Sequence, residues 1–350
     1  MNNQTISFAS GKGGSGKTII VANIAYALSK INQKTLLIDC DFSTRGLSFF
    51  ITKGLTDYQP NNCLLEYIKG DIKIGDVVPL HISDNIHLIA PTKAIEETIH
   101  FETTNPESYS VALYELLQNF KNDYSVILID TQSGTDWKST LACSLADLSV
   151  LVTEEDKTSF RVTSIINNLI QDLASKKNIE NDAIIKKNIR RGAFILNRCV
   201  REQSEDVISF LETGLLQSKY ISTILYEPKV KLAFLLDDFV LEKYPEAEFS
   251  IKICEIIDTI FKESESIHNT ISKLKNEFSE RKESSLKMEK RPMIRIKSLT
   301  FITMYLVLAV AVFSIYFQGL QSDLIRIFLL VIVAILGWEF LEIIRITEKR

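Results

Sequence analysis

The sequence has few of the residues from which disulfide frameworks, zinc sites and hydrolytic triads are built. Its 350 residues include five cysteines and four histidines. The cysteines are scattered, odd in number and contain no CxxC pair, so neither a disulfide framework nor a zinc site is predicted. The histidines have no metal-ligand spacing and complete no Ser/His/Asp set. This composition is typical of a protein in a reducing compartment.

The sequence also lacks a strong net charge and an N-terminal signal. The net charge is −4, from 40 Lys and Arg against 44 Asp and Glu. Without a global basic field, no specific nucleic-acid partner is expected. The first residues are polar and run straight into a strand-like stretch, which predicts no signal peptide. A chain of this length can hold one large α/β domain and an appendage.

A glycine-rich stretch lies between a strand-like run, 5–9, and a helical pattern, 19–30. Gly11, four further residues and then Gly16-Lys17-Thr18 fit the GxxxxGK[ST] spacing of a phosphate-binding loop. Glycines let backbone N–H groups turn inward, and the positive end of the following helix then favours an anion. Lys17 is expected to reach the β- and γ-phosphates and the Thr18 hydroxyl to bind Mg²⁺. The predicted nucleotide-binding residues are Gly11, Lys12, Gly13, Gly14, Ser15, Gly16, Lys17 and Thr18; the alternative is a chance glycine-rich turn.

A second lysine, Lys12, stands inside this loop, directly before Gly13 and Gly14. The string from Lys12 to Thr18 resembles the deviant Walker A motif of the ParA/MinD family of ATPases. In that family the extra lysine reaches across a dimer interface to the nucleotide of the partner subunit. The resemblance implies ATP as the ligand, an ATP-dependent homodimer and catalytic roles for Lys12 and Lys17. The alternative for Lys12 is a solvated loop lysine.

Over residues 1–262, strand-like apolar runs alternate with helical patterns. This alternation predicts an α/β P-loop NTPase fold, with a mostly parallel sheet sandwiched by helices. A short helix over 62–70 and a helix from Thr158 are also expected. The resemblance covers residues 4–262. The predicted strands are 4–9, 35–40, 86–90, 124–130, 148–153, 192–197 and 221–225.

Acidic residues end two of these strands, at the sheet edge where open α/β folds bind ligands. Asp39 and Asp41 are expected on the same side of their strand, near the glycine-rich loop. The resemblance implies that Asp41 orients or activates the attacking water and that Asp39 supports the Mg²⁺ shell. Asp130 ends an apolar strand in the Walker B arrangement, which holds Mg²⁺ directly or through water. The alternative for each is a polar residue that merely ends a strand.

The resemblance assigns roles to two more residues. Gly134 lies in a segment similar to the second switch and can bring its N–H to the γ-phosphate, although the family commonly has proline where this chain has Gln132. Asn197 ends a further strand at the same edge. In related ATPases an Asn at this place recognises the adenine amino group, which the resemblance implies for Asn197; the alternative is a simple strand-end cap.

The composition changes after residue 262. A charged segment, 263–298, has apolar residues at helical spacing, which predicts an amphipathic linker that either forms a short coiled coil or packs on its own domain. Residues 299–317 carry no charge, and that length is close to the roughly 20 residues that span a bilayer. With a second apolar run they predict a two-helix transmembrane hairpin over 299–341, followed by a basic tail, 342–350. A buried soluble helix is the alternative.

Basic residues flank both sides of the predicted hairpin, so the positive-inside rule places both termini and the ATPase domain, 1–262, in the cytoplasm. The resulting hypothesis is a ParA/MinD-type ATPase fixed to a bacterial-type inner membrane. Its Mg-ATP-dependent dimer would recruit or activate a protein partner that the sequence does not identify, and hydrolysis would reset it. One alternative is a nucleotide-binding scaffold without hydrolysis, for example in a defence or secretion complex. Another is a tyrosine autokinase of the polysaccharide-export type; such kinases usually end in a tyrosine cluster, whereas Tyr305 and Tyr316 lie inside the predicted hairpin.

Overall fold

The computed structural model describes residues 3–53, 63–92, 105–180 and 192–286. The chain divides into two compact units, Met1–Lys282 and Glu283–Arg350, and the following description concerns the first. The predicted hairpin, 299–341, and the basic tail lie outside the described residues. Within the described ranges, no helix combines the length and apolar character needed to cross a membrane.

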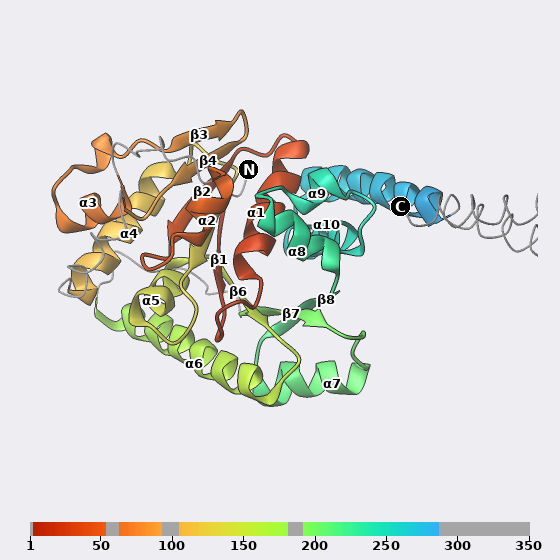
Figure 1. The fold of residues 1–350 in the computed structure, drawn as a ribbon. Helices are drawn as coiled ribbons and strands as arrows, with labels where there is room; N and C mark the ends of the chain where they lie inside the picture. Colours follow the sequence, from red (N-terminus) through yellow and green to blue (C-terminus); the bar gives the residue numbers. More distant parts are fainter. Residues whose placement is uncertain (1–2, 54–62, 93–104, 181–191, 287–350) are drawn as a thin grey trace, which may run out of the picture. The chain divides into compact units, whose positions relative to one another are not determined.

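An eight-stranded sheet forms the centre of the first unit (Figure 1). The strand order is β3-β4-β2-β5-β1-β6-β7-β8, and every neighbouring pair is parallel except β3–β4. The predicted α/β class with a mostly parallel sheet is therefore confirmed. The strands are β1 (Gln4–Ala9), β2 (Thr35–Cys40), β3 (Leu80–Ser83), β4 (Ile86–Ile89), β5 (Val126–Thr131), β6 (Leu148–Thr153), β7 (Ala193–Cys199) and β8 (Lys219–Leu225).

The sequence patterns did not reveal β3. This strand pairs only with β4 at the edge of the sheet, where His81 lies opposite His87. Its residues alternate between half-exposed and exposed. A four-residue edge strand of this kind lacks the apolar run by which the inner strands are recognised.

Helices cover both faces of the sheet (Figure 1). One apolar core joins the sheet to α1, α2, α9 and α10, and two others join its opposite face to α3–α6. Adjacent strand residues belong to opposite cores, as Leu37 and Leu36 do, because side chains alternate along a strand. The helices are α1 (Lys17–Lys30), α2 (Gly46–Ile51), α3 (Leu64–Lys69), α4 (Pro106–Phe120), α5 (Trp137–Leu145), α6 (Lys157–Glu180), α7 (Glu205–Ser209), α8 (Pro228–Leu235), α9 (Val240–Lys243) and α10 (Glu248–Ile260).

The segment predicted as a linker begins with a helix, 265–286, that packs on α10. Its apolar residues Ile267, Ile271 and Phe278 are buried in the same core as α1 and α10. Of the two alternatives, packing on its own domain is therefore the one observed. The first unit extends to Lys282, so the predicted boundary at 262 falls before this helix. The helix runs antiparallel to α10. Lys275 pairs with Glu255, Lys282 pairs with Glu248, and His268 Nδ1 lies 2.5 Å from Asp258 Oδ1.

Replacing Ile271 with alanine should destabilise the first unit, because Ile271 is fully buried and truncating a buried isoleucine costs about 2–5 kcal/mol. Urea unfolding of the full chain measures the change. Lys273→Ala, an exposed position on the same helix, is the matched control and should shift the free energy of unfolding by no more than about 0.5 kcal/mol. Equal effects of the two substitutions would contradict the packing of this helix.

Candidate nucleotide-binding site

The glycine-rich loop connects β1 to α1 at the carboxyl edge of the sheet. Gly14 and Gly16 have φ angles of +80° and +86°, in the left-handed region that glycine adopts without strain. A Cβ on Gly11 would lie 2.8 Å from Val162 Cγ1 of α6, and a Cβ on Gly16 would collide with the Asn197 side chain. Close approach of two neighbouring elements therefore requires glycine at both positions.

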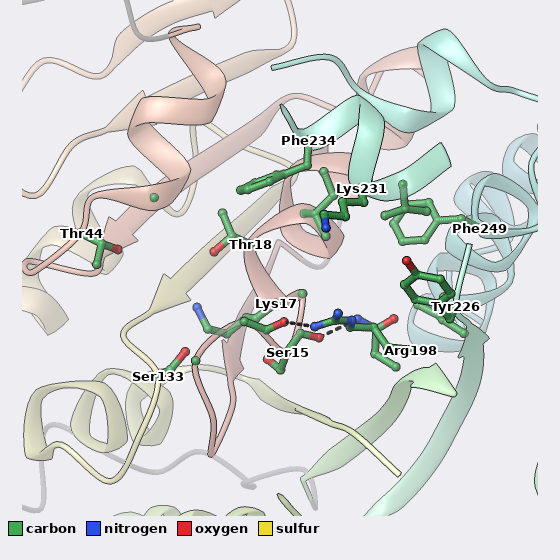
Figure 2. A pocket seen from close by; sticks show the side chains of 18 of the residues that line it. Ser15, Lys17, Thr18, Thr44, Ser133, Arg198, Tyr226, Lys231, Phe234 and Phe249 are labelled. Atoms are coloured by element: carbon green, nitrogen blue, oxygen red, sulfur yellow. Dashed lines mark hydrogen bonds between the residues drawn. The ribbon is translucent and has the colours of Figure 1, made fainter. Parts of the chain in front are cut away.

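This loop forms one wall of a pocket with a volume of about 660 Å³ (Figure 2). Figure 2 shows Lys17 and Ser133 at one side of the pocket and Tyr226 and Phe249 at the other. A polar end followed by an apolar end suits a phosphate chain attached to a base. The pocket is lined by residues 13–19, by Asp41, Ser43, Thr44 and Gly46, by Gln132 and Ser133, by Asn197 and Arg198, and by Ile224, Leu225, Tyr226, Glu227, Val230, Lys231, Phe234 and Phe249.

Three predicted residues, Lys17, Thr18 and Asp130, are in contact next to the polar end, where Lys17 and Thr18 line the pocket and the fully buried Asp130 does not. The Lys17 side chain is only 4% exposed, and its ammonium donates to Asp130 Oδ1 at 2.5 Å and to the Thr131 carbonyl. The Thr18 hydroxyl donates to Asp130 Oδ2 at 2.8 Å. The sheet register brings Asp130 here by placing it opposite Phe8, shortly before the loop. Burial raises the pKa of the Asp130 carboxyl, and the ammonium of Lys17 limits that rise.

The donor set fits a magnesium nucleotide. Hydroxyl and carboxylate oxygens, such as those of Thr18 and Asp130, are ligands that Mg²⁺ combines with substrate phosphates and water. Among the described residues, no group of three or more His, Cys, Asp or Glu side chains could hold a metal ion. Also within the described part of the chain, the buried Ser15 hydroxyl has no hydrogen-bond partner and lines the pocket, where a phosphate oxygen could accept from it.

Asp39 lies beside this cluster but does not line the pocket. Its fully buried carboxylate accepts the Ser48 N–H at 2.9 Å, the Ser48 hydroxyl at 2.7 Å and the Asp41 N–H at 3.0 Å. It faces Asp130 across the β2–β5 pair. Burial, and then the charge of Asp130, raise the pKa of Asp39 to about 7. Asp39 therefore holds α2 against the sheet, and its support of Mg²⁺ stays a prediction.

Asp41 lies just past the end of β2 and does line the pocket. Its carboxylate accepts N–H and hydroxyl groups of Ser43 and Thr44 at 2.6–3.1 Å. Burial alone would raise the pKa of Asp41, but the hydrogen bonds from Thr44 and Ser43 outweigh it and lower the pKa. Asp41 is thus an ionised acceptor at the pocket wall, and its action on a water molecule stays a prediction.

The predicted second switch follows β5. The Gly134 N–H donates to the Ser10 carbonyl at 2.9 Å. Gly134 does not line the pocket, whereas Gln132 and Ser133 do. The Ser133 hydroxyl also hydrogen bonds with the Ser10 hydroxyl at 3.0 Å. This segment therefore supports the start of the glycine-rich loop. A contact between Gly134 and a γ-phosphate stays a prediction.

Two residues at the end of β7 reach the glycine-rich loop. Asn197, 4% exposed, donates its side-chain amide to the Ser15 carbonyl at 2.6 Å, and its recognition of adenine stays a prediction. Arg198, with φ of +60°, donates to the Gly14 carbonyl at 2.8 Å (Figure 2). The sequence analysis missed Arg198, because only its position next to Asn197 hinted at the site and no spacing shows where its side chain goes.

Lys12 does not line its own pocket. Its ammonium lies 3.4 Å from Glu154 Oε2 and 3.6 Å from Asp156 Oδ2, and the side chain is 54% exposed. Glu154, which the sequence analysis did not single out, also pairs with Arg198 at 3.1 Å. The structure therefore brings Lys17, Thr18, Asp41, Asp130 and Asn197 to one pocket region and leaves the Lys12 ammonium outside it.

Residues 3–186, from β1 through α6, match the family model described as an AAA domain. An uncharacterised ATP-binding protein of Methanocaldococcus jannaschii is 28% identical over 277 residues, which cover 77% of this chain and 93% of that protein. The septum site-determining protein MinD of Synechocystis is 24% identical over 241 residues, which cover 65% of this chain and 82% of that protein.

Two solved structures have a fold similar to that of this chain. The MinD protein of Pyrococcus horikoshii complexed with Mg-ADP has a TM-score of 0.60 at 22% identity, over 76% of this chain and 98% of that one. The ATP complex of a single-residue variant of McdA from Cyanothece has a TM-score of 0.59 at 20% identity, over 74% of this chain and 96% of that one. At these identities the likeness establishes the fold, a P-loop NTPase fold of the MinD and ParA type.

Lys17→Ala should weaken ATP binding by about 30-fold or more, since losing one charge of a buried pair costs about 2–5 kcal/mol. Titration calorimetry with Mg-ATP measures the affinity. Lys30→Ala, an exposed lysine at the far end of the same helix, should leave it unchanged. An unaltered ATP affinity in a folded Lys17→Ala protein would remove Lys17 from the binding site.

Proposed function

Because the chain belongs to the AAA domain family and has the fold of the MinD and ParA P-loop ATPases, we propose that it binds Mg-ATP in this pocket and hydrolyses it to ADP and phosphate. The observation that carries the proposal is the buried cluster of Lys17, Thr18 and Asp130. It places a cation suited to the β- and γ-phosphates next to two oxygen ligands suited to Mg²⁺.

The residues at the pocket have different roles in the proposed hydrolysis. Thr18 and Asp130 would hold Mg²⁺, which would supply positive charge against the phosphate oxygens. Lys17 exchanges its hydrogen bonds to Asp130 and the Thr131 carbonyl for phosphate oxygens. Asp41 accepts a hydrogen bond from the attacking water and orients it, a role for which its lowered pKa keeps it ionised.

The position of Lys12 supports a dimer as the active form. Its ammonium lies outside its own pocket and remains half-exposed, so it is available to a second subunit. Two ATP-bound domains close face to face, and each Lys12 neutralises phosphate charge in the other. The closed dimer recruits or activates a protein partner, and loss of the γ-phosphate relaxes the segments after β2 and β5 and resets the switch.

Residues 299–341 anchor this switch in a bacterial-type inner membrane as a two-helix hairpin, with both termini and the ATPase domain in the cytoplasm. The support is the uncharged run 299–317 and the basic residues on both sides of the hairpin. Two spanning helices do not leave a bilayer as an interfacial amphipathic helix does. The ATP state therefore changes dimerisation or partner choice, and not membrane attachment.

A nucleotide-binding scaffold without hydrolysis is the second candidate. It is favoured by the four hydrogen bonds from Ser43 and Thr44 to the Asp41 carboxylate, three of them to Oδ1, because these donors compete with a water molecule for that carboxylate. Single-turnover measurement of phosphate release by the ATP-bound dimer distinguishes the candidates, because a scaffold releases none.

Lys12→Ala should retain ATP binding by the monomer but lose ATP-dependent dimers, and turnover should fall by about 10²–10³-fold, the usual loss when one stabilising group at a developing charge is removed. Sedimentation velocity and phosphate release measure the two effects. Lys30→Ala is again the control. Normal turnover in Lys12→Ala would mean that Lys12 is only a loop residue.

Membrane fractionation tests the anchor. The full chain should stay in the membrane pellet after carbonate washing, with ATP and with ADP alike, because the hairpin spans the bilayer. A chain that ends at residue 298 is the matched control and should appear in the supernatant. Release of the full chain upon hydrolysis would contradict the anchor.

A further inference from the structure

Lys231 is a basic residue in the pocket wall that the proposed hydrolysis does not use. It lies on α8 and lines the pocket together with two other basic residues, Lys17 and Arg198. Figure 2 shows Lys231 between Phe234 and Phe249, toward the apolar side of the pocket and away from the Lys17 ammonium. The pocket therefore offers a cation on both of its sides.

The three basic residues differ in what already binds them. The Lys17 ammonium pairs with Asp130 at 2.5 Å, and the Arg198 guanidinium pairs with Glu154 at 3.1 Å. The Lys231 side chain is exposed, and its ammonium forms no ion pair or hydrogen bond with any residue that the structure describes. Of these three cations, Lys231 alone can bind an anion without first giving up a described partner.

The neighbours of Lys231 on α8 explain why it stays unpaired. Glu227, one helical turn earlier, directs its carboxylate to the Phe249 N–H, which donates to Oε2 at 3.2 Å. Lys229, two residues before Lys231, pairs with Glu246 at 2.8 Å and does not line the pocket. The nearby acids thus have other partners, and the free charge of α8 faces the pocket at Lys231.

We propose that Lys231 binds the α-phosphate of the nucleotide and retains ADP in the pocket after hydrolysis. This inference rests on the proposed function, in which Lys17 holds the β- and γ-phosphates. The α-phosphate is joined to the ribose, so it lies between those phosphates and the base, toward the side of the pocket that carries Lys231. An ammonium on a flexible stem has three donors for phosphate oxygens.

The position of Lys231 separates binding from the chemical step. ATP and ADP both carry the α-phosphate, so a contact there has the same strength before and after the γ-phosphate leaves. An interaction of this uniform kind lowers KM without accelerating the reaction. Lys231 therefore slows the release of ADP, whereas Lys17 acts on the phosphates that take part in the reaction.

Lys231→Ala should raise the dissociation constants of ADP and of a non-hydrolysable ATP analogue by the same factor. That factor should be about three- to thirtyfold, between the effects of an exposed ion pair and of a charge-assisted hydrogen bond. Titration calorimetry of the full chain in detergent measures both constants. Lys231→Arg keeps the charge and should restore most of the affinity.

Lys229→Ala is the matched control, because it removes the same charge from the same helix outside the pocket. It should leave both affinities within about twofold of wild type, since exposed ion pairs contribute little. Equal losses in Lys229→Ala and Lys231→Ala would overturn the inference and indicate a general effect of charge. A larger loss for the ATP analogue than for ADP would also overturn it and place Lys231 on the γ-phosphate.

Kinetics test the retention of ADP. Radiolabelled ADP should dissociate faster from Lys231→Ala than from Lys229→Ala after excess unlabelled ADP is added, while single-turnover phosphate release at saturating ATP stays unchanged. Equal dissociation rates, or slower phosphate release in Lys231→Ala, would overturn the inference. If the wild-type chain binds neither nucleotide, the proposed function fails as well; normal binding by the wild type and by Lys231→Ala alike overturns the inference alone.

Discussion

The buried ion pair between Lys17 and Asp130 is the contact on which the rest of the site depends. Both side chains are almost fully excluded from water, and a buried charge is tolerated only when it is paired and hydrogen-bonded. The pair therefore requires β5 to lie directly beside β1, and it requires the loop between β1 and α1 to turn Lys17 back over the sheet edge. The Thr18 hydroxyl completes the arrangement on the second oxygen of Asp130.

Three hydrogen bonds from two neighbouring segments support the conformation of the glycine-rich loop. The segment after β5 holds its start through the Ser10 carbonyl, and the two residues at the end of β7 hold the carbonyls of Ser15 and Gly14. These contacts use carbonyl oxygens, which leaves backbone N–H groups of the loop to face an anion. A parallel sheet makes this possible, because the segments that follow its strands meet at one edge.

The first turn of α10 links this pocket to the last described helix. Phe249 lines the pocket, while the neighbouring Glu248 pairs with Lys282 at the end of the first unit. The Phe249 N–H also donates to Glu227, another residue of the pocket wall. Residues 265–282 of this helix are thus part of the first unit, and the contacts of Glu248 and Phe249 join them to the pocket wall.

The sequence by itself determined the inner strands, the glycine-rich loop and the acids at the ends of β2 and β5. These features are local: an apolar run or a glycine spacing selects its own backbone conformation. Only the tertiary structure decided that β3 joins the edge, that Asp39 binds Ser48, and that Glu154 and Arg198 share the region around Lys12. Each of these contacts joins polar or half-exposed residues whose partners are set by strand order and loop paths, and no short-range pattern records which distant side chain will lie within hydrogen-bonding distance.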